Sequence, residues 1–239
     1  MDGAFGWSPD GQKILGNAPT GIFVMDRDGS NVVPLQPGSP SDWQRVCTIT
    51  RTDANESITG TSGRDVICAG GGNDIIDAGE GDDIVFGGGG NDRLLGGPGD
   101  DILSGQVGSD VILPGLGDDF VAGDVGIDTV SFAGATVGMV ASLASGLANG
   151  EGEDWIMSVE NSIGSAKADS LTGSLRGNVL SGGAGSDHLF GGDGADHLRG
   201  GDGRDTLRGQ VGNDSLNGGP MRDICVQGPG TGPRIACEA

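Results

Sequence analysis

A strict nine-residue period is the feature that most constrains how this chain can fold. Between residues 63 and 128, a glycine, any residue and an aspartate recur eight times without slippage. An aliphatic residue follows each aspartate by two positions, so the unit reads G-G-x-G-x-D-x-U-x, with U aliphatic. The aspartates are Asp65, Asp74, Asp83, Asp92, Asp101, Asp110, Asp119 and Asp128, and the aliphatics are Ile67, Ile76, Val85, Leu94, Leu103, Ile112, Val121 and Val130. A fixed period of this kind indicates stacked repeat units.

The same unit returns in a second run nearer the C-terminus. Its aspartates are Asp187, Asp196, Asp205 and Asp214, and its aliphatics are Leu189, Leu198, Leu207 and Leu216. Three further positions keep the spacing but lack the glycine of the unit: Asp169, Asn178 and Asp223. The step from Asp128 to Asp169 is 41 residues, which is not a multiple of nine. The two runs therefore form separate blocks joined by an insert.

Elementary geometry predicts what one unit does. Strand side chains alternate, so x-U-x makes a short strand that turns only its aliphatic residue inward. The glycines of the other six residues let the chain turn back, because glycine adopts positive φ at little steric cost. Two units, or 18 residues, then complete one turn, and turns stack at about 4.8 Å. We expect an all-β fold: a parallel, right-handed β-solenoid with 18 residues per turn, in two blocks joined by an irregular β insert.

The composition shows that such a fold needs an added source of positive charge. The 239 residues include 51 glycines, carry a net charge of −21 and are 35% hydrophobic. Large apolar side chains are too few for an ordinary globular core. No apolar run is long enough to span a membrane, and the negative charge disfavours nucleic acid and anionic membrane surfaces as partners. A chain this acidic stays disordered unless something supplies positive charge.

The nonapeptide resembles the RTX (repeats-in-toxin) calcium-binding β-roll family over residues 60–131 and 165–224. The resemblance implies a parallel β-roll whose stacked loops hold Ca²⁺ through aspartate carboxylates and backbone carbonyls, the oxygen ligands that a hard cation prefers. It also implies that each loop pairs with the next but one. The ligand aspartates then form ladders: Asp65, Asp83, Asp101 and Asp119; Asp74, Asp92, Asp110 and Asp128; Asp187 with Asp205; and Asp196 with Asp214.

The gaps between rungs predict the number of ions. Three gaps in each long ladder and one in each short ladder give about eight Ca²⁺ sites, and eight divalent ions would offset most of the net charge of −21. Thr61 in the first loop and Asp124 in the eighth replace a glycine, so we expect weaker sites there. Three acidic residues that precede ladder aspartates are expected to face solvent and to add to the electrostatic field rather than act as ligands: Asp82, Asp100 and Asp118.

We divide the chain into five parts: an N-terminal segment (1–46), a first block (47–131), an insert (132–166), a second block (167–224) and a C-terminal cap (225–239). The N-terminal segment carries the turn-forming phrases W-S-P-D-G and M-D-R-D-G-S-N. They resemble the hairpins of TolB-like β-propeller repeats. One blade cannot close a propeller ring. We therefore expect this chain to be the C-terminal remainder of a longer protein, or a reading frame that starts late.

The four cysteines point to staples at the two ends of the repeats. None forms a C-x-x-C pair, which disfavours a zinc ribbon, and four cysteines allow three pairings. The two pairs that are close in sequence bracket the repeat region, so we favour Cys47–Cys68 and Cys225–Cys237. The alternative is four buried or free thiols.

Catalytic signatures are missing from the sequence. It contains no H-E-x-x-H, no G-x-S-x-G and no phosphate-binding loop. His188 and His197 stand nine residues apart, which is half a turn, so we expect them on opposite sheets, where they cannot share a metal or a proton. The periodic carboxylates are then ligands rather than acid–base pairs, and we expect no enzyme.

The leading hypothesis is a secreted bacterial module that is disordered at low calcium and folds when extracellular calcium fills its ladders. Since no signal peptide is visible, an export signal would lie at the C-terminus or upstream. The expected partners are calcium ions and an upstream catalytic, propeller or adhesive domain. One alternative is the C-terminal fragment of an RTX-bearing secreted hydrolase, protease or toxin. Another is an adhesin or surface-layer segment, which is disfavoured by mixed outward residues: Val66, Ile75, Ile84, Arg93 and Ile102.

Overall fold

The described part of the chain consists of strands joined by turns and loops. The computed structural model describes residues 47–50, 52–230, 234, 235 and 237, and the backbone of four strands before residue 47. The rest of the expected N-terminal segment and most of the tail beyond residue 230 lie outside the described residues. Across the described ranges there is no helix, and hence none that is long and apolar enough to cross a membrane.

The four N-terminal strands form an antiparallel sheet in chain order. They are β1 (Gly6–Trp7), β2 (Lys13–Ala18), β3 (Gly21–Asp26) and β4 (Val33–Pro34). Their side chains lie outside the described residues, so the likeness of this segment to a propeller blade stays a prediction.

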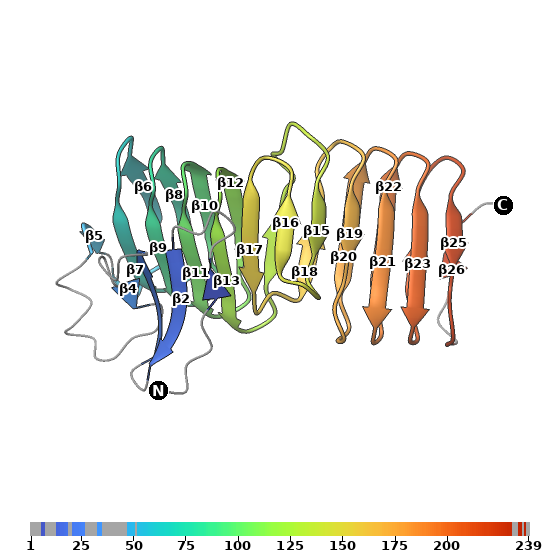
Figure 1. Cartoon of the computed structure of the whole chain (residues 1–239), viewed down its shortest axis with the longest axis horizontal. Helices are drawn as coiled ribbons and strands as arrows, with labels where there is room; N and C mark the ends of the chain where they lie inside the picture. The colour runs from blue at the N-terminus through green and yellow to red at the C-terminus, as the bar shows by residue number, and fades with distance from the viewer. Residues whose placement is uncertain are drawn as a thin grey trace.

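The remaining strands form the two sheets of a solenoid (Figure 1). The ten-stranded sheet comprises β6 (Ser57–Thr61), β8 (Ile75–Gly79), β10 (Arg93–Pro98), β12 (Val111–Leu116), β14 (Thr129–Ser131), β18 (Asn161–Ile163), β20 (Val179–Ala184), β22 (His197–Asp202), β24 (Ser215–Asn217) and β26 (Arg234–Ile235). The twelve-stranded sheet comprises β5 (Ile49–Thr50), β7 (Val66–Gly71), β9 (Ile84–Gly89), β11 (Ile102–Val107), β13 (Phe120–Val125), β15 (Val140–Ser142), β16 (Leu147–Asn149), β17 (Glu153–Met157), β19 (Ser170–Thr172), β21 (His188–Asp193), β23 (Thr206–Val211) and β25 (Ile224–Val226).

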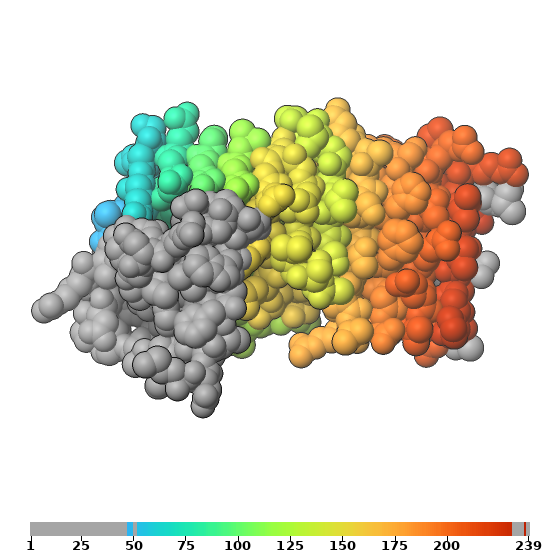
Figure 2. Space-filling view, in the orientation of Figure 1, coloured from blue at the N-terminus to red at the C-terminus, as the bar shows by residue number. Residues whose placement is uncertain are grey.

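The register between neighbouring strands of a block confirms the predicted turn length. Strands pair in parallel with a partner 18 residues away, as Leu94 pairs with Ile112 and Leu103 with Val85. Successive strands alternate between the two sheets, so each turn contributes one strand to each. In Figure 2 the colours run along the long axis from the first block to the second, because the chain advances one turn at a time within each block; the insert reverses this order, since β17 lies next to β13 and β15 next to β19.

The inward column of aliphatic side chains is the core of the solenoid. All twelve predicted aliphatics are at most 2% exposed, and they belong to one continuous hydrophobic cluster. The alternation of the strands and the stacking of the turns therefore bury a residue that no single unit could bury. This prediction is confirmed.

The strands of the repeats are longer than the three residues expected. The glycine pairs belong to the strands, since Gly70 pairs with Gly88 one turn later. Only residues 90–92 then separate β9 from β10. The expected six-residue loop is wrong in this respect, because the glycines keep the register of the neighbouring turn while they bend the chain.

The insert adds a meander to one sheet. β15 and β16 pair antiparallel, as do β16 and β17, whereas β17 joins β13 and β15 joins β19 in parallel. The meander gives one sheet its two extra strands. Phe132, Met139 and Val159 from the same region are buried in the main core. Where larger irregular turns were expected, the chain instead forms a hairpin within the sheet.

A second hydrophobic cluster lies among the outward residues of the first block. Its members are buried: Ile84, Phe86, Ile102, Phe120 and Ala122, with Val66, Cys68 and Trp155 packed against them. The ring of Trp155 meets Phe120 edge to face at 6.5 Å. The outward residues of β9, β11 and β13 therefore form a packed layer, whereas Ile75 on the opposite sheet is 54% exposed.

Candidate functional site

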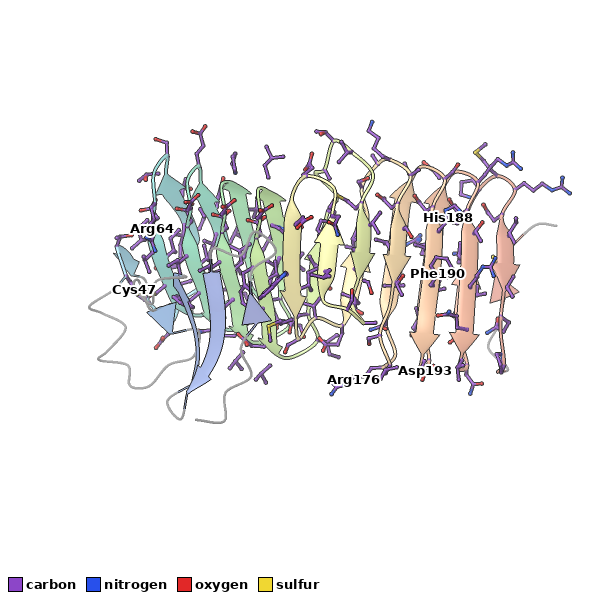
Figure 3. The ribbon with its side chains drawn as sticks, viewed as in Figure 1. Cys47, Arg64, Arg176, His188, Phe190 and Asp193 are labelled. Atoms are coloured by element: carbon purple, nitrogen blue, oxygen red, sulfur yellow. A yellow bond between two sulfur atoms is a disulfide. The ribbon has the colours of Figure 1, made fainter. Side chains whose placement is uncertain are left out.

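The repeat aspartates lie at the two edges of the solenoid, immediately before strands begin. One series precedes strands of the twelve-stranded sheet, and we call it ladder 1; the other precedes strands of the ten-stranded sheet, and we call it ladder 2. Figure 3 shows the two edges: Arg64 and His188, next to ladder 1 aspartates, lie at one, and Arg176 and Asp193 lie at the other. Loops that are distant in sequence are thereby stacked in two rows.

Each rung of a ladder is bonded to the next. The backbone N–H of a ladder aspartate donates to Oδ1 of the aspartate 18 residues later, at 2.7–3.1 Å. Asp92, for example, accepts from Asp74 and donates to Asp110. The predicted neighbours therefore lie in consecutive turns, with their carboxylates aligned along the edge.

The second carboxylate oxygen of most rungs has no donor within reach. Oδ2 is buried, with no hydrogen-bond partner among the described residues, in Asp74, Asp83, Asp92, Asp110, Asp119, Asp128, Asp187, Asp196, Asp205, Asp214 and Asp223. These side chains are at most 4% exposed. A buried carboxylate oxygen without a partner is costly and rare in folded proteins. A row of them indicates positions that a cation would satisfy.

Glycines leave the space beside these oxygens open. A Cβ on Gly87 would lie 2.6 Å from Asp92 Oδ2 and 2.8 Å from the carbonyl oxygen of Gly105, one turn on. Gly191 stands in the same relation to Asp196 Oδ2 and the carbonyl of Gly209. The first glycine of the pair thus keeps a cradle in which a carboxylate and a carbonyl oxygen converge. An oxygen-only donor set of this kind suits a hard divalent cation.

The residue four positions before each aspartate controls this arrangement. In the repeats this residue has positive φ, as in Gly88 (107°) and Gly97 (109°). Three other residues at this position retain positive φ: Gln106 has 72°, Asp124 has 71° and Gln210 has 68°. Such angles are uncommon for residues other than glycine. Their recurrence at one position shows that the stack imposes them.

In loops that carry serine or threonine at this position, that residue donates hydrogen bonds to the aspartate carboxylate of the same loop. Thr61 donates to Asp65 Oδ2 from its N–H at 2.7 Å and from its hydroxyl at 2.8 Å. Ser165 does the same for Asp169, with its N–H on Oδ2 and its hydroxyl on Oδ1. Asp65 is therefore a predicted ligand whose Oδ2 is already occupied by its own loop.

Burial raises the pKa values of several ladder aspartates. Desolvation raises the pKa of Asp119 to about 8 and that of Asp110 to about 7, and neighbouring carboxylates add to both shifts. It raises the pKa values of a further set to about 6: Asp83, Asp92, Asp128, Asp187 and Asp196. Without a cation, the fold holds these groups where their charged form is disfavoured. A bound cation inverts that preference.

The insert supplies two rungs that the repeat frame did not reveal. Asp119 N–H donates to Asp154 Oδ1 at 3.3 Å in ladder 1, and Asp128 N–H donates to Glu160 Oε2 at 2.9 Å in ladder 2. Residues 150–156 read G-E-G-E-D-W-I, which contains the G-x-D-x-U core of the unit. Asp154 lies 35 residues after Asp119, outside the nine-residue frame. A search for the motif without a frame would have found it.

The acidic residues one position before ladder 1 aspartates also pair with each other. Asp100 N–H donates to Asp82 Oδ1 at 3.1 Å, and Asp118 N–H donates to Asp100 Oδ1 at 3.0 Å. Asn73 and Asn91 make the equivalent bond beside ladder 2. Asp82, Asp100 and Asp118 therefore also cap backbone donors of the following turn, a role that the sequence did not reveal.

No cluster of three or more histidine, cysteine or acidic side chains suited to a metal exists in the part of the chain that the structure describes. The rungs lie one per turn, so a site here needs backbone carbonyls to complete it. His188 and His197 lie on β21 and β22, in opposite sheets, which confirms that they are separate.

Disulfides join the chain at both ends of the solenoid. They link Cys47 to Cys68 and Cys225 to Cys237, the two pairs favoured from the sequence. Cys225 pairs with Leu207 in the register and so occupies the position of an inward aliphatic residue.

Comparison with known families gives one match. The family model described as RTX calcium-binding nonapeptide repeat (4 copies) matches residues 51–85, 77–112, 86–121, 95–130, 163–198 and 190–223, together more than half of the chain. The matches include both ladders and leave most of the insert out. Among curated proteins, none matches the chain.

Proposed function

Because the chain belongs to the RTX calcium-binding nonapeptide repeat family, we propose that its two ladders bind about eight Ca²⁺ ions and that this binding drives folding of the solenoid. The proposed ligands in the first block are Asp65, Asp74, Asp83, Asp92, Asp101, Asp110, Asp119 and Asp128, and those in the second are Asp187, Asp196, Asp205 and Asp214. Loop carbonyls complete each site.

The buried Oδ2 atoms carry this proposal. Each has left water without gaining a hydrogen bond in the described structure. A divalent ion between consecutive loops would bind these oxygens and neutralise carboxylates that desolvation otherwise disfavours. The glycine cradle beside them supplies the space and the carbonyl oxygens.

Calcium binding and folding are coupled by electrostatics in this scheme. Neighbouring rungs stack at about 4.8 Å, where two unit charges repel by about 1 kcal/mol even in water. The net charge of −21 adds repulsion along the whole chain. The free energy of ion binding then stabilises the compact state against this repulsion, since the sites exist only when consecutive turns are stacked.

The proposed setting is the outside of a bacterial cell. Extracellular calcium modules work at about 10⁻⁴–10⁻³ M calcium, a range that would leave the chain unfolded before export and folded after it. Disulfides at both ends agree with an oxidising compartment. The module would act as a structural calcium-binding part beside a catalytic, propeller or adhesive domain.

Far-ultraviolet circular dichroism of the full chain tests this proposal. Calcium titrated into chelated protein should convert a disordered spectrum into a β spectrum, whereas magnesium, which prefers near-ideal octahedral sites, should not. A β spectrum that is already complete in chelator, with no change on adding calcium, would contradict the coupling. A measured stoichiometry of no bound calcium would contradict the binding.

A further inference from the structure

The insert contains a binding position that lies outside the nonapeptide pattern. We propose that Asp128, Ser158 and Glu160 form a further calcium site, which joins ladder 2 of the first block to the insert. This inference rests on the proposed function, and it adds a site at which the repeat is absent. Residues 131–162 match no copy of the repeat.

The first observation is an unpartnered oxygen aimed at this place. Asp128 is fully buried, its Oδ1 accepts from Asp110 N–H at 2.8 Å, and its Oδ2 has no partner in the described chain. In the repeats, the matching oxygen faces a carbonyl of the next turn beside a glycine. A Cβ on Gly123 would likewise contact Asp128 Oδ2 and the carbonyl oxygen of Ser158. Ser158 therefore replaces the next-turn glycine.

The second observation is the position of Glu160. Its Oε2 accepts from Asp128 N–H at 2.9 Å, which is the bond that a next-turn aspartate makes elsewhere in ladder 2. Two backbone bonds hold the turn in place, because Glu160 N–H and Asn161 N–H both donate to Asp128 O, at 3.1 and 2.9 Å. The extra methylene of glutamate lets a shorter loop bring a carboxylate to the same rung.

The third observation is the backbone of Ser158. Its φ is 51°, one of five positive values at residues other than glycine in the described chain. Such a conformation is strained and persists only where the surroundings fix it. Here it turns the Ser158 carbonyl toward Asp128. Two carboxylates and a carbonyl then offer oxygen ligands alone, as a hard cation requires.

The next gap of ladder 2 lacks these features. The rung after Glu160 is Asn178, whose Nδ2 donates to the Glu160 carbonyl at 2.6 Å and whose Oδ1 accepts from Ser174 N–H at 2.6 Å. A neutral amide with its own partners offers no charge to a cation. Ladder 2 therefore offers no charged ligand at Asn178, and the site at Asp128 is the last one of the first block.

Equilibrium dialysis of the full chain against calcium tests the site. Glu160→Gln removes the carboxylate charge but keeps an oxygen on Asp128 N–H, and it should bind one ion fewer per chain than the wild type. Glu153→Gln is the matched control, since this exposed residue lies in the same insert and loses the same charge; its stoichiometry should equal that of the wild type. Glu160→Gln with unchanged stoichiometry and midpoint would overturn the site.

Two further measurements keep the test decisive. In saturating calcium, hydrogen exchange of residues 156–163 should be slower in the wild type and in Glu153→Gln than in Glu160→Gln. If Glu160→Gln does not fold, Glu160→Asp decides, because it keeps the charge on a shorter side chain and should weaken one site by at least tenfold. Equal titrations of Glu160→Asp and wild type would then reject the site. A wild type that binds no calcium rejects the proposed function itself.

Discussion

At the scale of single residues, the backbone angle four positions before each ladder aspartate separates two kinds of loop. Where φ is positive, as at Gly88, the carboxylate Oδ2 remains without a donor; where Thr61 or Ser165 stands, its N–H and hydroxyl satisfy the acid. A protein donor and a cation therefore compete for the same oxygen. The side chain at this position decides which of them the loop accepts.

Thr61→Gly should strengthen the calcium site of the first loop. Residues 60–65 would then carry the complete G-G-x-G-x-D unit, and Asp65 Oδ2 would lose its hydroxyl donor. Glycine at position 61 could also adopt the positive φ of the other loops, in which the backbone N–H leaves Oδ2 without a donor. We expect one additional or tighter calcium ion per chain, measured by titration calorimetry. Thr61→Ser keeps the hydroxyl donor and should leave the binding curve unchanged. If both variants behave like the wild type, the hydroxyl does not govern the site.

The raised pKa values of the ladder predict how acid affects the calcium-free fold. Burial raises the pKa of Asp119 to about 8, that of Asp110 to about 7 and that of Asp92 to about 6, against about 3.9 in an unfolded chain. The folded state thus binds more protons than the unfolded state between about pH 4 and 8. The free energy of unfolding therefore falls as the pH rises through this range.

Circular dichroism of chelated protein tests this sign. The β signal at pH 5.5 should exceed that at pH 8, because protons neutralise the rungs in place of ions. Adding calcium should increase the β signal more at pH 8 than at pH 5.5, since calcium binds the deprotonated carboxylates. A larger β signal at pH 8 than at pH 5.5 in chelator would contradict the assigned cause.

At the scale of strands and loops, each rung belongs to two gaps of its ladder. Asp92 accepts from Asp74 and donates to Asp110, so it borders the gap on either side. Asp92→Asn keeps the oxygen that accepts from Asp74 but removes the charge. We expect calcium to be lost from both gaps, and the melting midpoint in calcium to fall by several degrees, at roughly 2–4 °C per kcal/mol for a chain of this size.

The control for this change is Asp77→Asn. Asp77 is exposed on β8 and belongs to no rung, so the same loss of charge should leave calcium stoichiometry intact. Atomic absorption of dialysed protein measures both variants. If Asp92→Asn binds as many ions as Asp77→Asn, the assignment of the rungs is incorrect.

The sequence predicts the regular elements well because one short period controls them. Leu103 is buried and Asp92 lies at an edge for the same reason: every ninth residue meets the same surroundings. The insert does not follow the nine-residue period, because the hairpin of β15 and β16 pairs within one sheet and so shifts the register of the residues after it. Asp154 and Glu160 therefore rejoin the ladders at distances from Asp119 and Asp128 that no frame predicts.

At the scale of the whole molecule, the C-terminal tail closes one end of the stack. β26 pairs with β24 as the last strand of the ten-stranded sheet, and Cys225–Cys237 holds the chain on both sides of it. The bond closes a loop with a sequence separation of 12. Such a loop contributes about 3 kcal/mol through the entropy of the unfolded chain. An unpaired edge strand at this end would invite pairing with another chain.

The double variant Cys225→Ser, Cys237→Ser should therefore self-associate. We expect dimers and larger species that increase with concentration in analytical ultracentrifugation, in calcium, because β24 becomes accessible. Replacing Cys47 and Cys68 by serine offers a matched comparison at the other end of the solenoid. A monomeric C-terminal variant at all concentrations would show that the tail holds its place without the bond.

The direction of the ladder bonds gives the molecule unlike ends. Within each block, a repeat rung that is followed by another donates its N–H to the carboxylate of the following turn, so at the N-terminal end Asp65 accepts from the hydroxyl of Thr48 instead of from an earlier rung. Its strands also run parallel throughout each block. Identical solenoids could therefore stack head to tail in one register and form a fibre with a single direction. The disulfides Cys47–Cys68 and Cys225–Cys237 near the two ends of the solenoid limit this stacking.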